Sequence, residues 1–241
     1  MDLGLKGKSV LVTGGSKGIG LACAKAFVAE GCQVHLAARD KDRLAQAART
    51  LGPSAKTHSV DLRDGAALRS LAKDCAEVDI LVNNAGDIPG GTLETLDEQK
   101  WRHAWELKVF GFINLTRELY PHLKTRKGVI VNVIGMAGEH GTFEYICGAT
   151  ANAGLANFTK ALGRGYAQNR VRVVGVHPPS TRTDRIITLM KAQAKAKFGD
   201  ESRYEELMGN VIEPEQVGDT VCFLASARAG QLSGVVLNLG A

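Results

Sequence analysis

The sequence lacks the features of a disulfide-linked, zinc-ribbon or membrane protein. It has only five cysteines, and no two of them form a Cys-x-x-Cys pair. This pattern speaks against a disulfide framework and against a metal site, and it suits a reducing cytoplasm, so we expect a cytoplasmic protein without metal. No apolar run reaches the roughly 18 residues that a membrane span needs. The N-terminal stretch MDLGLKGKSV also lacks the apolar segment of a signal peptide.

Charge of one sign is not concentrated anywhere in the chain. The 30 Lys and Arg residues are scattered, and the net charge is only +5. No run of five or six like charges indicates a nucleic-acid-binding arm, so we expect neither nucleic acid nor membrane as a partner. A length of 241 residues with 44% hydrophobic residues fits one large α/β domain over residues 1–241.

The most informative stretch is VLVTGGSKGIG, residues 10–20. An apolar strand, a glycine-rich turn and an alanine-rich helix at 21–30 follow one another, which is the order that a dinucleotide-binding loop needs. Gly14 can take backbone angles closed to other residues, Gly18 lets the backbone approach a pyrophosphate, and Gly20 lets the helix pack on the strand. The alternative is a turn that binds no cofactor. The loop residues that we expect to bind a cofactor are Gly14, Ser16, Lys17, Gly18, Ile19 and Gly20.

Strand and helix patterns alternate along the rest of the chain. Strands are predicted at 32–38, 57–60, 78–82, 129–133, 171–176 and 235–239, and helices at 42–50, 65–75 and 155–168. One or two long helices are predicted between 96 and 120, ending at Pro121. The alternation predicts a Rossmann-type, doubly wound α/β fold with a mostly parallel seven-stranded sheet and sites at the carboxyl ends of its strands. Residues 183–210 are expected to form a mobile helical flap over the substrate.

Two motifs carry a resemblance to the short-chain dehydrogenase/reductase family. Thr13 stands before the G-x-x-x-G-x-G spacing, and the sequence NNAG follows the apolar strand at 78–82. The resemblance implies an NAD(P)(H)-dependent oxidoreductase that forms a homodimer or homotetramer. It also implies that Asp61, with Leu62, meets the adenine. The remaining positions that it assigns to the cofactor are Asn83, Ala85 and Gly86 of NNAG, and the backbone at Pro178.

The end of the second strand bears on the choice between NADP(H) and NAD(H). An acidic residue there would bind the ribose hydroxyls of NAD, but this sequence has Ala38 followed by Arg39. A guanidinium can pair with a 2′-phosphate, and Lys17 could add charge on the same side. We therefore favour NADP(H) over NAD(H). The alternative is that Arg39 and Lys17 are solvated surface charges.

The family resemblance implies four catalytic residues, Asn, Ser, Tyr and Lys, that this sequence replaces. Local alignment puts Lys108, Gly135, Gly148 and Asn152 at these positions, with the intervals of 13 and 4 residues that the family pattern has between the last three. The chain is therefore interpreted as a divergent member that lacks the usual catalytic residues. Asn152 can still hydrogen-bond a ribose hydroxyl.

Tyr145 is the candidate for a substitute acid. It lies seven residues before Asn152, a spacing similar to that in enoyl-thioester reductases of this superfamily. Our hypothesis makes Tyr145 the proton donor or oxyanion ligand and Lys108 its electrostatic partner. Alternatively, Tyr145 only lines the pocket and Lys108 points to a subunit interface or to solvent.

The favoured function is hydride transfer to or from a small or medium carbonyl, alcohol or enone at this atypical site. Two other functions stay open. One is a catalytically inactive, cofactor-binding homologue with a regulatory or scaffolding role, which the four replacements favour. The other is a non-redox lyase or isomerase built on the same fold.

Overall fold

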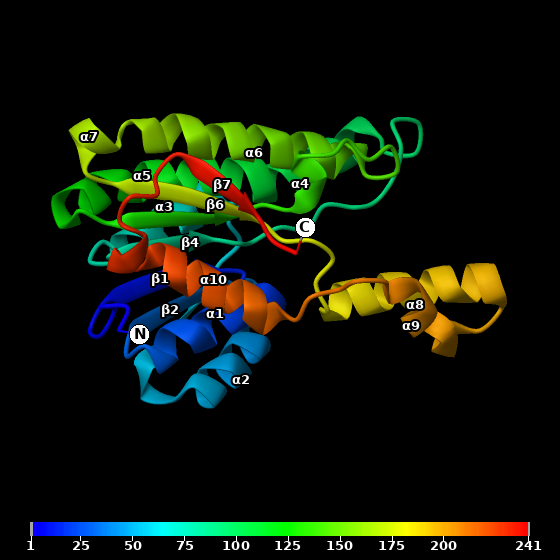
Figure 1. The fold of residues 1–241 in the computed structure, drawn as a ribbon, viewed down its shortest axis with the longest axis horizontal. Coiled ribbons are helices and arrows are strands. Elements are labelled where there is room, and N and C mark those ends of the chain that lie inside the picture. The colour runs from blue at the N-terminus through cyan, green and yellow to red at the C-terminus, as the bar shows by residue number, and fades with distance from the viewer. Residues whose placement is uncertain (1, 241) are drawn as a thin grey trace.

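A parallel sheet of seven strands forms the centre of the protein (Figure 1). The computed structural model describes residues 2–240. The strands lie in the order β3-β2-β1-β4-β5-β6-β7, and every neighbouring pair is parallel. The predicted doubly wound α/β fold is thereby confirmed. The strands are β1 (Ser9–Thr13), β2 (Gln33–Ala38), β3 (Ala55–Ser59), β4 (Ile80–Asn83), β5 (Val129–Val133), β6 (Arg172–His177) and β7 (Val235–Asn238).

Helices cover both faces of this sheet (Figure 1). One face carries α1 (Gly18–Ala29), α2 (Lys41–Leu51) and α10 (Pro214–Ala225). The other carries α3 (Gly65–Asp74), α4 (Glu98–Trp105), the π-helical segment η2 (Glu106–Phe110), α5 (Gly111–Arg126), α6 (Ile146–Arg164) and the short α7 (Tyr166–Asn169). Helices α8 (Asp184–Phe198) and α9 (Glu205–Met208) extend from the end of the sheet. The 3₁₀ turns are η1 (Gly52–Ser54), η3 (Met136–Gly138), η4 (Glu201–Tyr204) and η5 (Ala227–Ala229).

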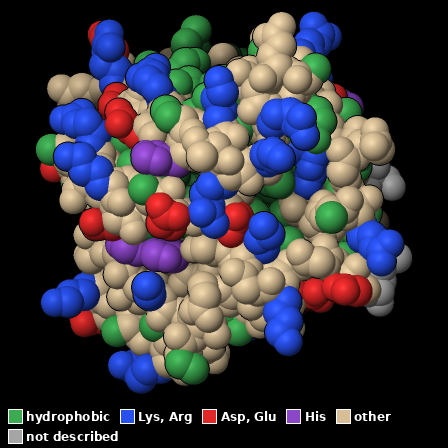
Figure 2. Space-filling model, turned by 90° about the vertical axis from the view of Figure 1, so that its left-hand side faces the viewer, with side chains coloured by type: hydrophobic (Ala, Val, Ile, Leu, Met, Phe, Trp, Pro, Cys, Tyr) green, Lys and Arg blue, Asp and Glu red, His purple; other side chains and the backbone are tan. Residues whose placement is uncertain are grey.

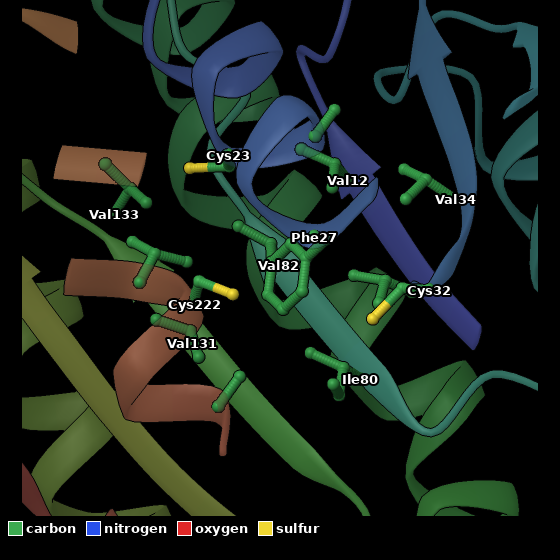
Figure 3. Packing of buried hydrophobic residues seen from close by; sticks show 14 of the residues in the cluster. Val12, Cys23, Phe27, Cys32, Val34, Ile80, Val82, Val131, Val133 and Cys222 are labelled. Atoms are coloured by element: carbon green, nitrogen blue, oxygen red, sulfur yellow. The ribbon is translucent and has the colours of Figure 1, made fainter. Parts of the chain in front are cut away.

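The central strands are buried on both faces, which explains why they appear in the sequence as continuous apolar runs. Figure 3 shows Phe27 pointing from α1 onto the sheet, beside Val82, Ile80 and Cys222. A second cluster packs α3 and α5 on the opposite face around Leu81. Helices on two faces thus fix the strands, and with them the loops at their carboxyl ends.

Two helix boundaries differ from the sequence prediction by six residues or more. Helix α6 begins at Ile146, nine residues before the predicted start at 155, so Gly148 and Asn152 are helical. Glycine disfavours a helix interior, but Cys147 and Ala151 of this first part are buried in a cluster with Ala104 of α4, and that packing outweighs the cost. Pro121 does not end α5, because the helix continues to Arg126. The buried Leu123 lies in that last turn, and its packing outweighs the missing hydrogen bond at the proline.

The surface carries mixed charge. Lys and Arg side chains are spread over the face in Figure 2, with Asp and Glu among them. Within residues 2–240, no helix has both the length and the apolar character that crossing a membrane requires. The cysteines that the structure describes are all free and buried, namely Cys23, Cys32, Cys75, Cys147 and Cys222.

Candidate active site

A cleft of about 1260 Å³ opens at the carboxyl ends of the strands. Most of the residues singled out from the sequence line it. They are Gly14, Ser16, Lys17, Gly18, Ile19, Arg39, Leu62, Ala85, Gly86, Lys108, Tyr145, Asn152 and Pro178. Three others, Gly20, Asp61 and Asn83, are not among its lining residues. The first turns of α8 also line the cleft, up to Leu189, so part of the predicted flap borders it.

The glycine-rich loop forms one wall and has the backbone expected from the sequence. Gly14 and Gly18 have φ values of +66° and +54°, which favour glycine. A Cβ on Gly20 would overlap the Gly14 carbonyl oxygen, so the helix packs tightly against the loop. Helix α1 begins at Gly18 and directs its free N–H groups toward the cleft, an arrangement suited to a phosphate group.

Hydrogen bonds join the ends of β1 and β4 beneath this loop. The Thr13 hydroxyl donates to the Val82 carbonyl at 3.3 Å and accepts from the backbone N–H groups of Asn84 and Ala85 at 2.9 and 3.1 Å. The Asn84 amide donates to the Thr13 carbonyl at 3.0 Å. Sequence reasoning gave Thr13 and Asn84 no separate role, although both stand inside the quoted motifs. Their bonds hold the loop in place before any ligand binds.

Two of the predicted cofactor residues direct their side chains elsewhere. The Asn83 amide is buried below the strand ends and donates to Thr116 Oγ1 at 3.1 Å and Asn132 Oδ1 at 3.0 Å. The Asp61 carboxylate is paired with the Arg63 guanidinium at 2.6 Å, and that hydrogen bond lowers the pKa of Asp61. Asn83 therefore stabilises the sheet, while Asp61 ties the end of β3 to the following turn.

Cationic side chains border the end of the cleft beyond β2. The Arg39 guanidinium is half exposed and lies 3.8 Å from the Asp87 carboxylate. Lys17 and Arg43 also line the cleft. The sequence motifs do not single out Arg43 as a cofactor residue, although it stands only four residues after Arg39. Asp40 pairs with Arg43 at 3.1 Å. The cations here outnumber the carboxylates by one, which suits an anionic group.

Lys108 lies deep in the opposite part of the cleft. It belongs to the π-helical segment η2, and such segments are frequent at functional sites. Its ammonium donates to the carbonyls of Val133 and Ile134 at 3.2 and 2.9 Å, and it lies 5.2 Å from the centre of the Phe112 ring. Burial, with a smaller contribution from the Arg185 charge, lowers the pKa of Lys108 to about 7. This amine can therefore exchange a proton near neutral pH.

Tyr145 and Asn152 fill the space left by two glycines. A Cβ on Gly148 would overlap the Tyr145 ring and lie 2.6 Å from its hydroxyl oxygen. A Cβ on Gly135 would lie 2.8 Å from the Asn152 amide nitrogen. Each of the two positions without a side chain is thus occupied by a polar group from a neighbour. Gly135 has a φ of +137°, and its carbonyl accepts a hydrogen bond from His177 Nδ1 at 2.6 Å, so His177 also positions this segment.

The side chain of Asn152 has a buried hydrogen-bond acceptor without a donor. Its side-chain oxygen has no hydrogen-bond partner among residues 2–240, although the residue is only 3% exposed. A buried unpaired acceptor costs about 1–3 kcal/mol, so a ligand hydroxyl that donates here would bind favourably. A ribose hydroxyl fits this position, and the glycine-rich loop fits a pyrophosphate. The residues present therefore fit a dinucleotide cofactor.

Known proteins share this fold and sequence pattern. Residues 8–194 match the family described as short chain dehydrogenase. The chain is 30% identical to 3-oxoacyl-acyl-carrier-protein reductase from Vibrio harveyi, covering 98% of this chain and 97% of the relative. It is 31% identical to meso-2,3-butanediol dehydrogenase from Serratia marcescens, covering 94% and 90%. The crystal structure of L-sorbose reductase from Gluconobacter frateurii, complexed with NADPH and L-sorbose, is similar with a TM-score of 0.93, 29% identity and coverage of 99% and 97%.

Proposed function

The chain belongs to the short chain dehydrogenase family of NAD(P)-dependent oxidoreductases, and we propose that it transfers hydride between NADP(H) and a small or medium carbonyl, alcohol or enone. Tyr145 is the proton donor or oxyanion ligand, and Lys108 is its electrostatic partner. The observation that carries this assignment is the position of the Tyr145 ring, which takes the place of a side chain at Gly148. Gly148 stands where the family resemblance expects the catalytic tyrosine.

The chain's own residues define how the cofactor is held. The loop from Gly14 to Ile19 and the N-terminus of α1 would bind the pyrophosphate, while Arg39 and Lys17 would pair with the 2′-phosphate. Asn152 would accept a hydrogen bond from a ribose hydroxyl, and the backbone at Pro178 would bind the carboxamide. A bound nicotinamide supplies the hydride to the substrate carbon or accepts it in the reverse direction.

Tyr145 and Lys108 then act on the substrate oxygen. When the carbon of a carbonyl gains hydride, the Tyr145 hydroxyl gives its proton to the oxygen, the alcohol forms, and solvent returns a proton to the phenolate. An ammonium has three N–H donors, and Lys108 uses two of them on backbone carbonyls. When Lys108 is protonated, the third is available to the cleft that this residue lines, where the positive charge stabilises the developing oxyanion.

The relatives' names support a carbonyl–alcohol substrate, because they include a 3-oxoacyl reductase, a butanediol dehydrogenase and a sorbose reductase. Residues 183–210 act as the flap over that substrate, since the first turns of α8 line the cleft. Arg185 of this helix donates to the Ile88 carbonyl across the cleft mouth. The proposal includes a homodimer or homotetramer in the cytoplasm, a compartment that suits free thiols.

A second candidate function is cofactor binding without turnover. It is favoured by Gly135 and Gly148, which carry no group for acid catalysis. A non-redox lyase or isomerase is the third candidate. We rank it last, because a protein without redox chemistry would not need the glycine loop that this chain keeps.

Titration of the purified protein with NADPH and NADH, followed by turnover on a panel of carbonyls and enones, separates the proposal from the second candidate, and product formed without net change in NADPH would identify the third. The proposal expects tighter NADPH binding together with NADPH consumption. Binding without consumption on the whole panel would favour the second candidate. Failure to bind either dinucleotide would refute the proposal.

A further inference from the structure

Three side chains with metal-binding atoms meet on the sheet face that α3 covers, outside the cleft lining. His35 lies on β2, His58 on the edge strand β3, and Cys75 directly after α3. Ala37 pairs with His58 across the two parallel strands, and side chains two residues apart share a face, so both imidazoles point to the same side of the sheet. The fold itself therefore brings together residues that stand far apart in the sequence.

The three atoms form a triangle of the size that a tetrahedral ion requires. His35 Nδ1 lies 2.9 Å from His58 Nε2, and Cys75 Sγ lies 3.4 and 3.7 Å from these two nitrogens. Zinc bonds of about 2.0–2.1 Å to nitrogen and about 2.3 Å to sulfur place two nitrogens about 3.3 Å apart and nitrogen and sulfur about 3.5 Å apart. The observed separations differ from these values by at most about 0.4 Å, which a small rotation of the rings accommodates.

We propose that His35, His58 and Cys75 bind a zinc ion that ties the edge strand β3 to β2 and α3. Two imidazoles and one thiolate are ligands that Zn²⁺ prefers. Both imidazoles are partly exposed, so water can reach the fourth coordination position. The ion displaces the proton of the hydrogen bond between the rings, and that proton moves to the other nitrogen of the same ring. The Cys75 thiol loses its proton to solvent and binds as a thiolate.

The surroundings agree with this assignment. The negative charge of Asp74 acts on both His58 and Cys75, while Lys56 contributes positive charge nearby. No local motif in the sequence signals this cluster, because known zinc motifs rely on short spacings such as Cys-x-x-Cys, and these three residues are 23, 17 and 40 positions apart.

Cobalt substitution tests the site directly on the full chain, purified without a histidine tag and stripped with a chelator. One equivalent of Co²⁺ should produce the visible bands of a tetrahedral ion and a near-ultraviolet band from thiolate-to-cobalt charge transfer, and Zn²⁺ should abolish both. Cys75→Ala should lose the charge-transfer band. His58→Gln is a second variant in case the buried Cys75→Ala fails to fold, because His58 is partly exposed. It should weaken Co²⁺ binding at least about tenfold. Cys222→Ala is the control, because Cys222 is a buried thiol with no histidine among its recorded partners.

Thermal unfolding gives a second readout that is independent of dehydrogenase activity. Zn²⁺ at about a hundredfold excess over its Kd should raise the Tm of wild type and of Cys222→Ala by about 5–10 °C and should leave Cys75→Ala unchanged. A charge-transfer band that persists in Cys75→Ala, or wild-type protein without any cobalt band, would overturn the proposal. Neither result would bear on the function of the cleft.

Discussion

The two walls of the cleft differ in how completely their polar groups are satisfied. On the wall built from β1, β4 and the glycine loop, Thr13 and Asn84 engage each other and the adjoining backbone in hydrogen bonds. On the wall built from β5, η2 and α6, Asn152 of α6 keeps an unpaired buried oxygen, and Lys108 of η2 is buried without a carboxylate partner among its recorded contacts. The first wall is ready to hold a ligand, whereas the second needs a ligand to complete its hydrogen bonds.

In the proposed function, the first wall keeps the glycine motif of the family resemblance, whereas the second wall uses Tyr145 in place of a catalytic side chain at Gly148. Phosphate binding depends on backbone N–H groups and close approach, which glycines at fixed spacing provide. Proton transfer depends on one side-chain atom in one place, and a side chain from a neighbouring position can supply it. We propose that Tyr145, whose ring lies over Gly148, is such an exchange in this protein.

Removal of the Tyr145 hydroxyl should have the largest effect on the second wall of the cleft. Tyr145→Phe keeps the ring that fills the space over Gly148 but has no proton to give. We expect kcat to fall about 10²–10⁴-fold, with NADPH affinity unchanged. Steady-state kinetics on a confirmed substrate, with a fluorescence titration of NADPH, measure the two quantities. Full activity in this variant would show that Tyr145 only lines the pocket.

The burial of Lys108 predicts a pH-dependent stability. Its pKa in the folded protein is about 7, below the ordinary value of 10.5, so between these pH values the unfolded chain holds a proton that the folded chain lacks. The free energy of unfolding therefore rises with pH in this window, by at most about 1.4 kcal/mol per pH unit. Lys108→Met abolishes that contribution.

Thermal unfolding of the two proteins from about pH 7 to about pH 9 measures this difference. The wild type should gain stability relative to Lys108→Met as the pH rises. The buried cysteines titrate in both proteins, so their contribution cancels in the comparison. Parallel curves for the two proteins would mean that the Lys108 amine is protonated throughout.

A matched pair of glycine substitutions tests the first wall. Gly14 and Gly52 have φ values of +66° and +74°, but a Cβ on Gly14 would lie 2.9 Å from the Asn84 amide, whereas around Gly52 the space is open. Both alanine variants carry the cost of a side chain at positive φ, about 1–3 kcal/mol. Only Gly14→Ala should lower NADPH affinity, by about tenfold or more, in a fluorescence titration. Equal affinities in the two variants would contradict the role given to the loop.

The smallest expected effect is on the preference for NADPH over NADH, because the Arg39 side chain is half exposed. Arg39→Asp should weaken NADPH binding about fivefold, since an exposed ion pair contributes at most about 1 kcal/mol, and should weaken NADH binding less. Arg49→Asp makes the same charge change on the exposed side of α2 and should leave both affinities as they are. Unchanged NADPH affinity in Arg39→Asp would mean that another group binds the 2′-phosphate, or that the protein does not prefer NADPH to NADH.

The sequence was sufficient for the sheet and the glycine loop, because both depend on short-range patterns of apolar residues and glycines. It did not reveal that α6 begins at Ile146, because helix propensity at Gly148 opposes what packing imposes. The contact between Tyr145 and Gly148, like the meeting of His35 with Cys75, depends on side-chain placement in three dimensions. Such contacts have no local signature, so only the structure brings them to light.

The stoichiometry of the reaction tests the central claim, that both walls work together in hydride transfer. Wild-type protein is incubated with NADPH and each carbonyl of the panel, and the NADPH consumed and the alcohol formed are both quantified. We expect one NADPH oxidised for each alcohol formed. Product formed with no change in NADPH, or NADPH bound tightly but never consumed with any substrate, would contradict this account.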